Sequence, residues 1–368
     1  MRKVMVLYAD LFNLGGIQKY NRHLCDALET IFSEYEFLAL SMCDSKKNQF
    51  KHWRNIKIWF CGHLNLKFIR NFLFILKTLL VALREKPTFL ICAHVNLSPL
   101  ALFFKKMCGL KYAVLTHGVD VWGLTRGLRY QGLKCADVIT AVSNYTKSRM
   151  VANGIDEHKI ELLQNTIDTS CFYPQAPNRS LLRQLRLENK RVLLTVGRIS
   201  SQERYKGHNS MLHILKKLPE DYVWIVIGDG DDVSGLQQKA QKFGAIHRVR
   251  FLRSVENERL IDYYNLCNIF VMPSKGEGFG IVFLEAMACG KPVIGGNKDG
   301  STEPLMNGKL GFLVDPDDEK EIIEAIRLAS ESNEERTNPG YLRSQVDAFF
   351  GLDVFRRRVK EIFEKQPL

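Results

Sequence analysis

Two glutamates flank a glycine-containing segment in the second half of the chain, and their spacing indicates a binding site. Glu277 is followed at once by Gly278-Phe279-Gly280, and Glu285 comes eight residues after Glu277. A helix that begins near Phe279 or Gly280 offers backbone N–H groups and a positive dipole end, which suit a phosphate. Carboxylates can accept hydrogen bonds from sugar or ribose hydroxyls. The segment therefore predicts a site for a sugar joined to a phosphate. The alternative is a capped surface loop followed by a helical glutamate that faces water.

Two cations further upstream could bind such a phosphate. Arg198 follows the apolar segment 192–196, and Lys206 comes eight residues later. A guanidinium group binds phosphate oxygens in pairs, and an ammonium group adds a point charge. Together they could neutralise a diphosphate leaving group without a metal ion. Asp229 and Asp231 form a D-x-D pair that could bind a divalent cation, but the neighbouring glycines explain them as a sharp turn, and we expect no metal.

Two loops in the first half of the chain also carry candidate groups. Gly15 and Gly16 follow the apolar segment 4–8, and adjacent glycines let the backbone approach a ligand closely. They lack the G-x-G-x-x-G spacing of a dinucleotide-binding fold. His117 follows the apolar segment 112–116 and is placed to meet a substrate hydroxyl. Taken alone, His117 is explained more simply as a hydrogen-bonded structural histidine.

These loops are positioned by short apolar segments that alternate with helical patterns along the whole chain. Such alternation is typical of parallel sheets with helices on both faces, which is an α/β fold. Open sheets of this kind bind ligands at the carboxyl ends of their strands, so the candidate residues should converge. The predicted strands are 4–8, 36–40, 56–59, 89–93, 112–116 and 138–142 in the first half, and 192–196, 223–227, 249–252, 269–272 and 292–295 in the second.

The length and composition fit two globular domains. The chain has 368 residues, of which 46% are hydrophobic and 25% charged. A polar, proline-containing stretch over 165–190 places the join near residue 170. We predict one domain over 1–170 and a second over 171–350. The charged amphipathic pattern near the end of the chain predicts a closing helix, 351–368, which is expected to complete the first domain.

The cysteines and the first residues bear on the compartment. None of the nine cysteines forms a C-x-x-C pair, which favours the reduced thiols of a cytoplasmic protein over a disulfide framework or a zinc site. Met1-Arg2-Lys3 and the apolar run after it resemble a signal peptide. Asp10 ends that run too early, so a buried strand is predicted instead.

The positive charge is concentrated in one segment. The net charge is +12, and residues 46–86 contain ten Lys or Arg and one acid, Glu85, with aromatic and aliphatic residues between them. Its apolar part, 68–83, is too short and too charged to span a bilayer. The segment could lie on an anionic membrane surface, or it could be a core helix whose cations face water. Nucleic-acid binding is a third interpretation, which no recognisable module supports.

The chain as a whole resembles the retaining glycosyltransferases of family 4. These enzymes have the GT-B fold, in which two Rossmann-like domains face each other across a cleft. The resemblance implies that the domain over 1–170 binds the acceptor and that the domain over 171–350 binds the nucleotide sugar. The resemblance covers nearly the whole length, is densest over 196–315, and has as its core the E-x7-E pattern of Glu277 and Glu285, followed by Ala286-Met287-Ala288. It implies transfer of a hexosyl group from a UDP- or GDP-sugar to a saccharide or lipid-linked acceptor, in cell-surface polysaccharide or glycolipid synthesis. The alternatives are a catalytically silent GT-B binding subunit, a sugar phosphorylase and a nucleotide-sugar epimerase.

The resemblance also implies roles for the candidate residues. Glu277 would hold hydroxyls of the donor sugar, and Glu285 would bind the ribose. Arg198 and Lys206 would clamp the diphosphate, and His117 would lie near the reaction centre. The catalytic set is therefore Glu277, His117, Arg198 and Lys206. The other donor-binding positions implied are Gly15, Gly16, Arg253, Val255, Gly278, Phe279, Gly280, Ile281 and Val282.

Some positions depart from the family pattern. Arg253 stands where glycine is common, so the contacts to the base around Arg253-Ser254-Val255 are open. Asn165-Thr166 replaces a frequent Asn-Gly, and residues 200–204 lengthen the approach to Lys206. None of these changes removes a proposed catalytic group. We expect no cofactor, no metal and no nucleic acid. The expected location is cytoplasmic, with peripheral binding through 46–86 to the inner face of the plasma membrane as the membrane alternative.

Overall fold

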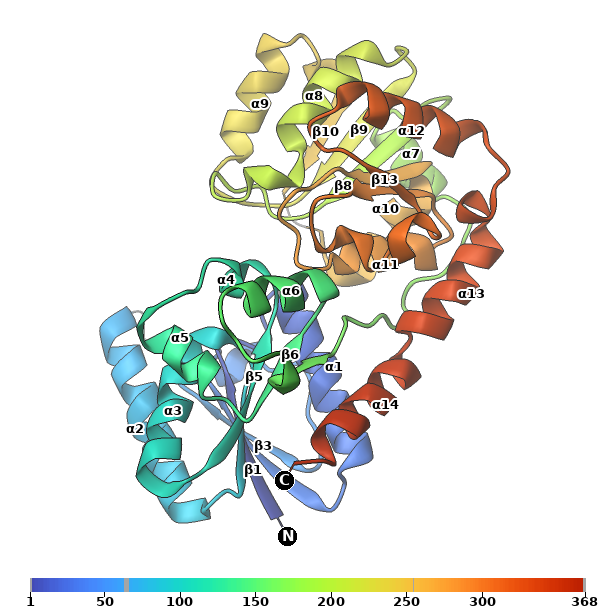
Figure 1. The fold of residues 1–368 in the computed structure, drawn as a ribbon. Coiled ribbons are helices and arrows are strands. Elements are labelled where there is room, and N and C mark those ends of the chain that lie inside the picture. The colour runs from blue at the N-terminus through green and yellow to red at the C-terminus, as the bar shows by residue number, and fades with distance from the viewer. Residues whose placement is uncertain (1, 63–65, 254, 367–368) are drawn as a thin grey trace. The chain divides into compact units, whose positions relative to one another are not determined.

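The computed structural model describes residues 2–62, 66–253 and 255–366, and the chain forms two compact units (Figure 1). The first, here called the N-terminal unit, consists of Met1–Thr166 together with Leu352–Leu368. The second, the C-terminal unit, is Ile167–Gly351. The chain therefore leaves the first unit at Thr166, close to the join that its polar stretch predicts, and returns to it for the last helix.

The N-terminal unit is built on a sheet of seven parallel strands. Their order is β3-β2-β1-β4-β5-β6-β7. The central strand β1 is buried from Val4 to Tyr8, because helices cover both faces of the sheet and such strands are apolar throughout. The strands are β1 (Arg2–Tyr8), β2 (Tyr35–Ser41), β3 (Ile56–Phe60), β4 (Phe89–Cys92), β5 (Lys111–Thr116), β6 (Val138–Ala141) and β7 (Ile160–Leu162).

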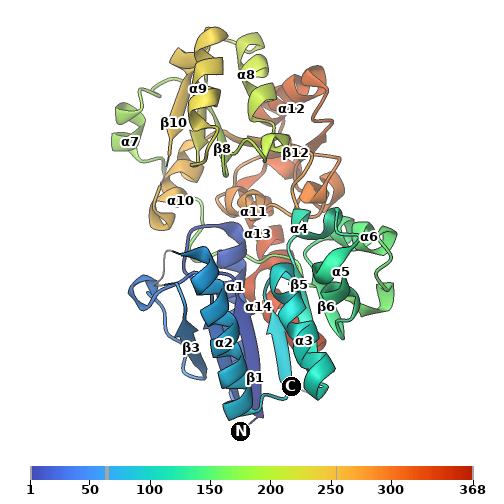
Figure 2. The ribbon, with the colours of Figure 1, turned by 90° about the vertical axis from the view of Figure 1, so that its left-hand side faces the viewer.

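Helices cover the two faces of this sheet. On one face α1 packs against α14, with the Tyr20 and Phe355 rings 5.6 Å apart. On the other face lie α2 and α3, which send Phe74 and Phe104 into the core (Figures 1 and 2). The helices are α1 (Gly16–Ile31), α2 (Lys67–Glu85), α3 (Ser98–Cys108), α4 (Val119–Trp122), α5 (Gly127–Lys134), α6 (Asn144–Ala152) and α14 (Leu352–Phe363). Short 3-10 turns are η1 (Lys46–Asn48), η2 (Val95–Leu97) and η3 (Glu157–Lys159).

The C-terminal unit has a six-stranded parallel sheet in the order β10-β9-β8-β11-β12-β13. The chain runs outward from β8 to β10 and then returns to the other side of β8, so the strand order reverses between β8 and β11. Ligands of open α/β sheets bind at such a reversal, outside the carboxyl ends of the strands. The strands are β8 (Arg191–Val196), β9 (Tyr222–Ile227), β10 (Val249–Leu252), β11 (Ile269–Met272), β12 (Val293–Gly296) and β13 (Phe312–Val314).

The helices of this unit enclose a core around the fully buried Trp224 of β9. They are α7 (Arg179–Gln184), α8 (His208–Lys217), α9 (Val233–Lys242), α10 (Asn257–Leu266), α11 (Ile281–Ala288), α12 (Glu319–Glu331) and α13 (Pro339–Phe350). The 3-10 turns are η4 (Arg204–Lys206), η5 (Ile246–Arg248), η6 (Gly300–Thr302), η7 (Met306–Gly308) and η8 (Glu335–Thr337).

The predicted elements are confirmed with two additions. Each of the eleven strands expected from the sequence is present within one or two residues of its predicted bounds. The structure adds β7 and β13, which have three residues each and are too short to show a periodic pattern. The helical pattern near the C-terminus corresponds to two helices, α13 and α14, because Gly351 is extended between them and bridges to Ile167.

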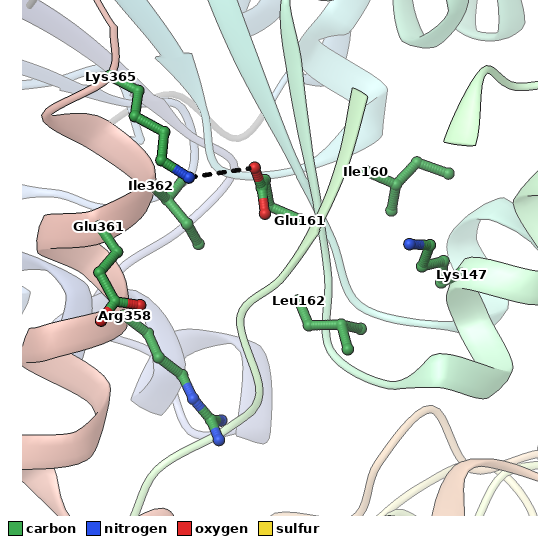
Figure 3. A pocket seen from close by; sticks show the side chains of 8 residues that line it. All are labelled: Lys147, Ile160, Glu161, Leu162, Arg358, Glu361, Ile362 and Lys365. Carbon is green, nitrogen blue, oxygen red and sulfur yellow. Dashed lines mark ion pairs between the residues drawn. The ribbon is translucent and has the colours of Figure 1, made fainter. Parts of the chain in front are cut away.

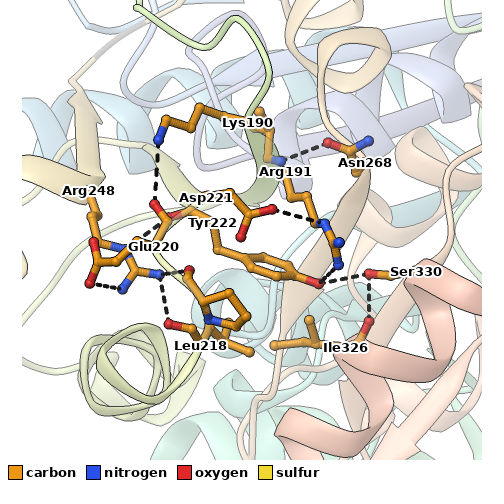
Figure 4. Close-up of polar contacts among 12 residues, drawn as sticks. Lys190, Arg191, Leu218, Glu220, Asp221, Tyr222, Arg248, Asn268, Ile326 and Ser330 are labelled. Atoms are coloured by element: carbon orange, nitrogen blue, oxygen red, sulfur yellow. Dashed lines mark hydrogen bonds and ion pairs between the residues drawn. The ribbon is translucent and has the colours of Figure 1, made fainter.

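The amino ends of β8, β9 and β10 are held by a polar network (Figure 4). The Arg191 guanidinium lies 3.1 Å from the Asp221 carboxylate and donates to the Tyr222 hydroxyl at 3.1 Å. Arg248 is buried and donates to the carbonyls of Tyr222, at 3.0 Å, and Pro219. The buried charge of Arg248 is thus satisfied within the unit, so the network at the amino ends of these strands has a structural role.

Candidate functional site

The loops after β8, β11 and β12 carry the candidate groups of the C-terminal unit. These three strands are neighbours in the sheet, so their carboxyl ends lie side by side. The loop after β8 contains Arg198 and leads through η4 to Lys206. The loop after β11 contains Glu277, and the loop after β12 contains Asp299, to which the sequence analysis assigns no role.

The loop of Glu277 is held by the loop of Asp299. The buried Asp299 carboxylate accepts hydrogen bonds from the Glu277 N–H at 2.7 Å and the Ser274 hydroxyl at 2.7 Å through Oδ2. Its Oδ1 accepts from the Ser301 N–H at 2.9 Å. The Gly300 N–H donates to the Glu277 carbonyl at 2.8 Å. Both backbone groups of Glu277 are therefore fixed by residues 299–300.

Glycine is required at two positions of this arrangement. A Cβ on Gly300 would lie 2.1 Å from the Gly278 carbonyl oxygen, which no real contact allows. Gly280 has a φ of 87° and forms the N-cap of α11, a left-handed conformation that side chains disfavour. The chain thus passes directly from Glu277 into the amino end of α11, and Glu277 lies in a loop and Glu285 in a helix, as predicted.

The electrostatic setting of Glu277 is mixed. Its side chain is partly buried, and burial raises the pKa of the Glu277 carboxyl, while the charge of Lys206 opposes that shift. Burial likewise raises the pKa of Asp299, against the effect of the hydrogen bonds donated by Glu277 N–H and Ser274. Lys206 is thus close enough to act on Glu277, as expected for groups that share one site.

The two cations are joined by a third residue. Arg198 Nη1 lies 3.0 Å from Glu203 Oε1, and Lys206 Nζ lies 2.8 Å from Glu203 Oε2. The turn that carries Lys206 is also tied to the loop of Glu277, because the Lys275 N–H donates to the Tyr205 carbonyl at 2.9 Å. The structure therefore brings Arg198 and Lys206 together, and Glu203 is a residue of the site that the sequence analysis missed.

Glu285 lies in the interior of the unit. Its side chain is 4% exposed, and it accepts a hydrogen bond from the Tyr264 hydroxyl at 2.6 Å. The alternative of a helical glutamate that faces water is therefore wrong. Tyr264 belongs to α10 and is separated from Glu285 by 21 residues, so only the packing of α10 against α11 pairs them. The ribose contact of Glu285 stays a prediction.

At two other predicted donor-binding positions the side chain is buried, so only the backbone is available to a ligand. The Phe279 ring is buried and packs edge-on against Phe350 at 5.8 Å, so its side chain has a structural role and only its backbone fits the prediction. Ile281 is also buried, whereas Val282 is partly exposed. These contacts to sugar and phosphate remain predictions that concern the backbone.

The predicted base-binding segment lies at the edge of the sheet. Arg253 is exposed and follows β10, and β9 separates that strand from β8. Val255 is partly buried, and Ser254 lies outside the described residues. The structure therefore does not join Arg253 to the Glu277 and Lys206 cluster by any hydrogen bond or ion pair between the described side chains.

The D-x-D pair is used within the unit. Asp231 accepts hydrogen bonds from the backbone N–H of Ser201, at 3.0 Å, and from its hydroxyl, and these bonds lower the pKa of Asp231 to about 2. Asp229 accepts from the Gly230 N–H at 2.9 Å. Within the described ranges, no three His, Cys, Asp or Glu side chains are grouped as metal ligands. Metal-independent binding remains an expectation.

In the N-terminal unit, Gly15 and Gly16 lie at the exposed start of α1. The loop that leads to them is anchored by the buried Asp44, whose carboxylate accepts from the Leu11 N–H at 2.6 Å. The glycines are thus presented at the carboxyl end of β1, which is where the sequence places a ligand-approaching loop.

His117 follows β5 and has a structural hydrogen bond. Its Nε2 lies 2.9 Å from the Ala93 carbonyl oxygen, so Nε2 carries the proton and Nδ1 the lone pair. Its ring packs edge-on against Tyr20 at 5.3 Å. Burial lowers the pKa of His117, so the ring is neutral at pH 7. The structural interpretation accounts for this bond, and a role near the reaction centre stays a prediction.

A cavity of about 300 Å³ lies elsewhere in the N-terminal unit (Figure 3). It is bounded by α14, β7 and α6, with Lys147, Glu161, Arg358 and Lys365 among its lining residues. The Lys365 ammonium lies 3.9 Å from the Glu161 carboxylate. None of the residues predicted to bind or react lines this cavity, so it is separate from the candidate site.

Solved structures show which fold this is. The sucrose-phosphate synthase of Thermosynechococcus elongatus superposes with a TM-score of 0.82 at 19% identity, over 99% of each chain. The Anabaena HepE protein in complex with UDP and glucose superposes with a TM-score of 0.81 at 18% identity, over the full length of both chains. The fold is thus the GT-B fold of two Rossmann-like domains.

Sequence comparisons define the family. Residues 14–170 match the model of Glycosyltransferase Family 4, and residues 179–342 match that of Glycosyl transferases group 1. The chain belongs to glycosyltransferase family 4.

Two mycobacterial relatives have the same name, GDP-mannose-dependent alpha-(1-6)-phosphatidylinositol monomannoside mannosyltransferase. The protein of Mycolicibacterium smegmatis is 32% identical over 248 residues, which is 62% of this chain and 64% of that protein. The protein of Mycobacterium tuberculosis strain H37Rv is 30% identical over 212 residues, 54% of this chain and 55% of that protein. The chain thus spans less than two thirds of the length of either relative.

Proposed function

We propose that the protein transfers a hexosyl group from a nucleotide diphosphate sugar, with retention of the anomeric configuration. The observation that carries the proposal is that Glu203 joins Arg198 to Lys206, and that a hydrogen bond from the Lys275 N–H to the Tyr205 carbonyl ties the turn of Lys206 to the loop of Glu277. A carboxylate for sugar hydroxyls and two cations for a diphosphate are the groups that such a donor needs. The mycobacterial relatives are named as GDP-mannose-dependent enzymes, which supports GDP-mannose as the first donor to test.

In this proposal electrostatics are the main source of rate enhancement. Arg198, Lys206 and the amino end of α11 stabilise the departing diphosphate, while Glu277 holds hydroxyls of the sugar. The transition state has oxocarbenium character, and the leaving phosphate takes the proton of the acceptor, which gives attack from the same face. The alternative is that Glu277 acts as a nucleophile. Trapping of a glycosyl adduct on Glu277 would decide for that alternative.

The acceptor proposed is a lipid-linked saccharide or glycolipid, reached from a membrane surface. Helix α2 buries Phe74 and Val81 in the core, but much of its remaining apolar surface is exposed. No helix in the described part of the chain is long and apolar enough to cross a bilayer. The exposed large hydrophobic residues of α2 are Phe68, Ile69, Phe72, Ile75, Leu76, Leu80 and Leu83.

An anionic lipid surface fits this face of α2 better than a second copy of the chain. Lys67 and Arg84 are exposed on the same helix, and two copies would bring these like charges together. Apolar side chains among cations match the boundary between acyl chains and anionic headgroups. The alternative of a core helix accounts only for the buried residues of α2.

Vesicle flotation tests the membrane proposal. We expect the protein to float with anionic vesicles and to lose this on substitution of Phe68 and Phe72 by Glu. Phe349→Glu is the matched control, because Phe349 is exposed on α13 of the other unit. Equal flotation of the unaltered protein, the Phe68 and Phe72 variant and Phe349→Glu would contradict the proposal. Absence of flotation of the unaltered protein would contradict it as well.

Calorimetry tests the donor site. GDP, UDP and their sugar conjugates are titrated in EDTA into the unaltered protein, Arg198→Ala and Arg204→Ala. Arg204 is a matched control, because it is similarly exposed and pairs with Asp232 instead of Glu203. We expect one nucleotide series to bind, and we expect this binding to be lost in Arg198→Ala alone. Binding by no nucleotide would contradict the proposed glycosyltransferase activity, and rescue by manganese would contradict metal independence and point to Asp229 and Asp231.

A further inference from the structure

The segment between Arg198 and Lys206 carries a carboxylate that bridges them. Glu203 Oε1 lies 3.0 Å from Arg198 Nη1, and Glu203 Oε2 lies 2.8 Å from Lys206 Nζ. The Glu203 side chain is 19% exposed and that of Lys206 is 13% exposed, whereas Arg198 is mostly in solvent. One carboxylate therefore engages both cations through its two oxygens.

The backbone holds Glu203 in this position. The Glu203 N–H donates to the Ser200 carbonyl at 2.9 Å, and the Lys206 N–H donates to the Glu203 carbonyl at 3.1 Å. Ser201 is bound in turn to the Asp231 carboxylate. These bonds place Glu203 and Lys206 on one side of η4, three residues apart. The residues that lengthen this loop, 200–204, are therefore held by hydrogen bonds. These bonds position the Glu203 carboxylate between the two cations.

Burial of Lys206 explains why an anion lies beside it. An ammonium group that is largely removed from water is disfavoured unless an anion lies beside it. The positive charge of Arg198, without an anion, would disfavour the Lys206 ammonium group further. Glu203 supplies the missing negative charge. A diphosphate would supply the same charge to the same two nitrogens.

We propose that Glu203 occupies the cation pair in the absence of a donor, and that the diphosphate displaces its carboxylate. This inference rests on the proposed function, in which Arg198 and Lys206 bind the diphosphate. A carboxylate and a phosphate cannot both contact the two cations without strong repulsion between them. The affinity for the donor is then the difference between two ion-pair energies. Glu203 lowers this affinity and keeps the two cations in place.

The test is calorimetric titration of GDP and UDP into the unaltered protein and Glu203→Gln. Removal of the competing charge should tighten binding of the nucleotide diphosphate by about threefold to tenfold, the scale of a partly exposed ion pair. Glu220→Gln is the matched control, because it also removes one negative charge from the C-terminal unit. Glu220 precedes β9 at the amino ends of the strands, whereas Glu203 lies beyond their carboxyl ends. It should leave the affinity unchanged.

The outcomes separate this inference from the proposed function. Affinity that is unchanged or weaker in Glu203→Gln, while Arg198→Ala abolishes binding, overturns the displacement and leaves the diphosphate site standing. Binding that survives in Arg198→Ala overturns the proposed diphosphate site itself. A structure of the nucleotide complex gives a second readout that needs no variant. Displacement requires that Glu203 has left both cations, and retention of both ion pairs overturns it.

Discussion

Substitution of Asp299 by Asn should loosen the loop that presents Glu277. The carboxylate of Asp299 accepts from the Glu277 N–H and the Ser274 hydroxyl at one oxygen, and from the Ser301 N–H at the other. An amide of the same shape keeps one oxygen as an acceptor and replaces the other by an NH2 group. In either orientation of the amide, this NH2 group would face a backbone N–H, that of Glu277 or that of Ser301.

The magnitude follows from these contacts. The hydroxyl of Ser274 can rotate toward Ser301, whose hydroxyl lies 3.0 Å away, so the unsatisfied group is one backbone N–H, that of Glu277 or that of Ser301. A buried donor that loses its acceptor costs about 1–3 kcal/mol. Burial raises the pKa of Asp299, so removal of its charge returns part of that cost. We therefore expect Asp299→Asn to lower the free energy of unfolding by about 1–3 kcal/mol.

Thermal unfolding and kinetics measure the two consequences. A domain of this size should melt about 2–4 °C lower for each kcal/mol lost. Because Glu277 is then held less firmly, kcat/KM for transfer should fall by about tenfold or more. Asp315→Asn is the control, since Asp315 forms a surface ion pair with Lys298. If Asp299→Asn melts and turns over like the unaltered protein, Asp299 does not position Glu277.

Two further predictions concern stability. Burial, with a smaller effect of Lys206, lowers the pKa of His208 from 6.5 to about 4, so the unfolded chain binds a proton that the folded one does not. The free energy of unfolding should therefore fall by about 3 kcal/mol as the pH drops from about 6.5 to about 4. Urea unfolding over this pH range should show a smaller fall in His208→Gln. An equal fall in the variant and the unaltered protein would refute the prediction. Gly300→Ala should destabilise the protein by about 1–3 kcal/mol, because the added methyl meets the Gly278 carbonyl, whereas Gly340→Ala has its nearest atom at 3.5 Å and should be neutral or stabilising. Equal melting of the two alanine variants would argue against the close approach at Gly300.

The parts of the fold that could be predicted are those with a local cause. A strand covered on both faces must be apolar along its whole length, so segments such as 4–8 and 269–272 are visible in the sequence. Strands β7 and β13 were not predicted, because segments of three residues are too short to show a hydrophobic pattern. Helix α2 was visible as an amphipathic segment, but which of its apolar residues are buried depends on the sheet beneath it.

The candidate site divides in the same way. Glu277, Arg198 and Lys206 could be predicted because each follows an apolar strand beside glycine or within a short motif, and the sheet brings such loops together. Glu203 is close to both cations in the sequence, but an acid in a polar loop is ordinarily solvated, and only the folded η4 turn directs it onto Arg198 and Lys206.

The sequence by itself determined the alternation of strands and helices, the family and the residue types of the site. Only the tertiary structure decided which of these residues hold one another. Asp299 binds Glu277 because β11 and β12 are adjacent, and Tyr264 binds Glu285 because α10 packs beside α11. The physical reason is that hydrophobic periodicity acts over neighbouring residues, whereas a hydrogen bond between residues more than 20 positions apart depends on how strands and helices pack.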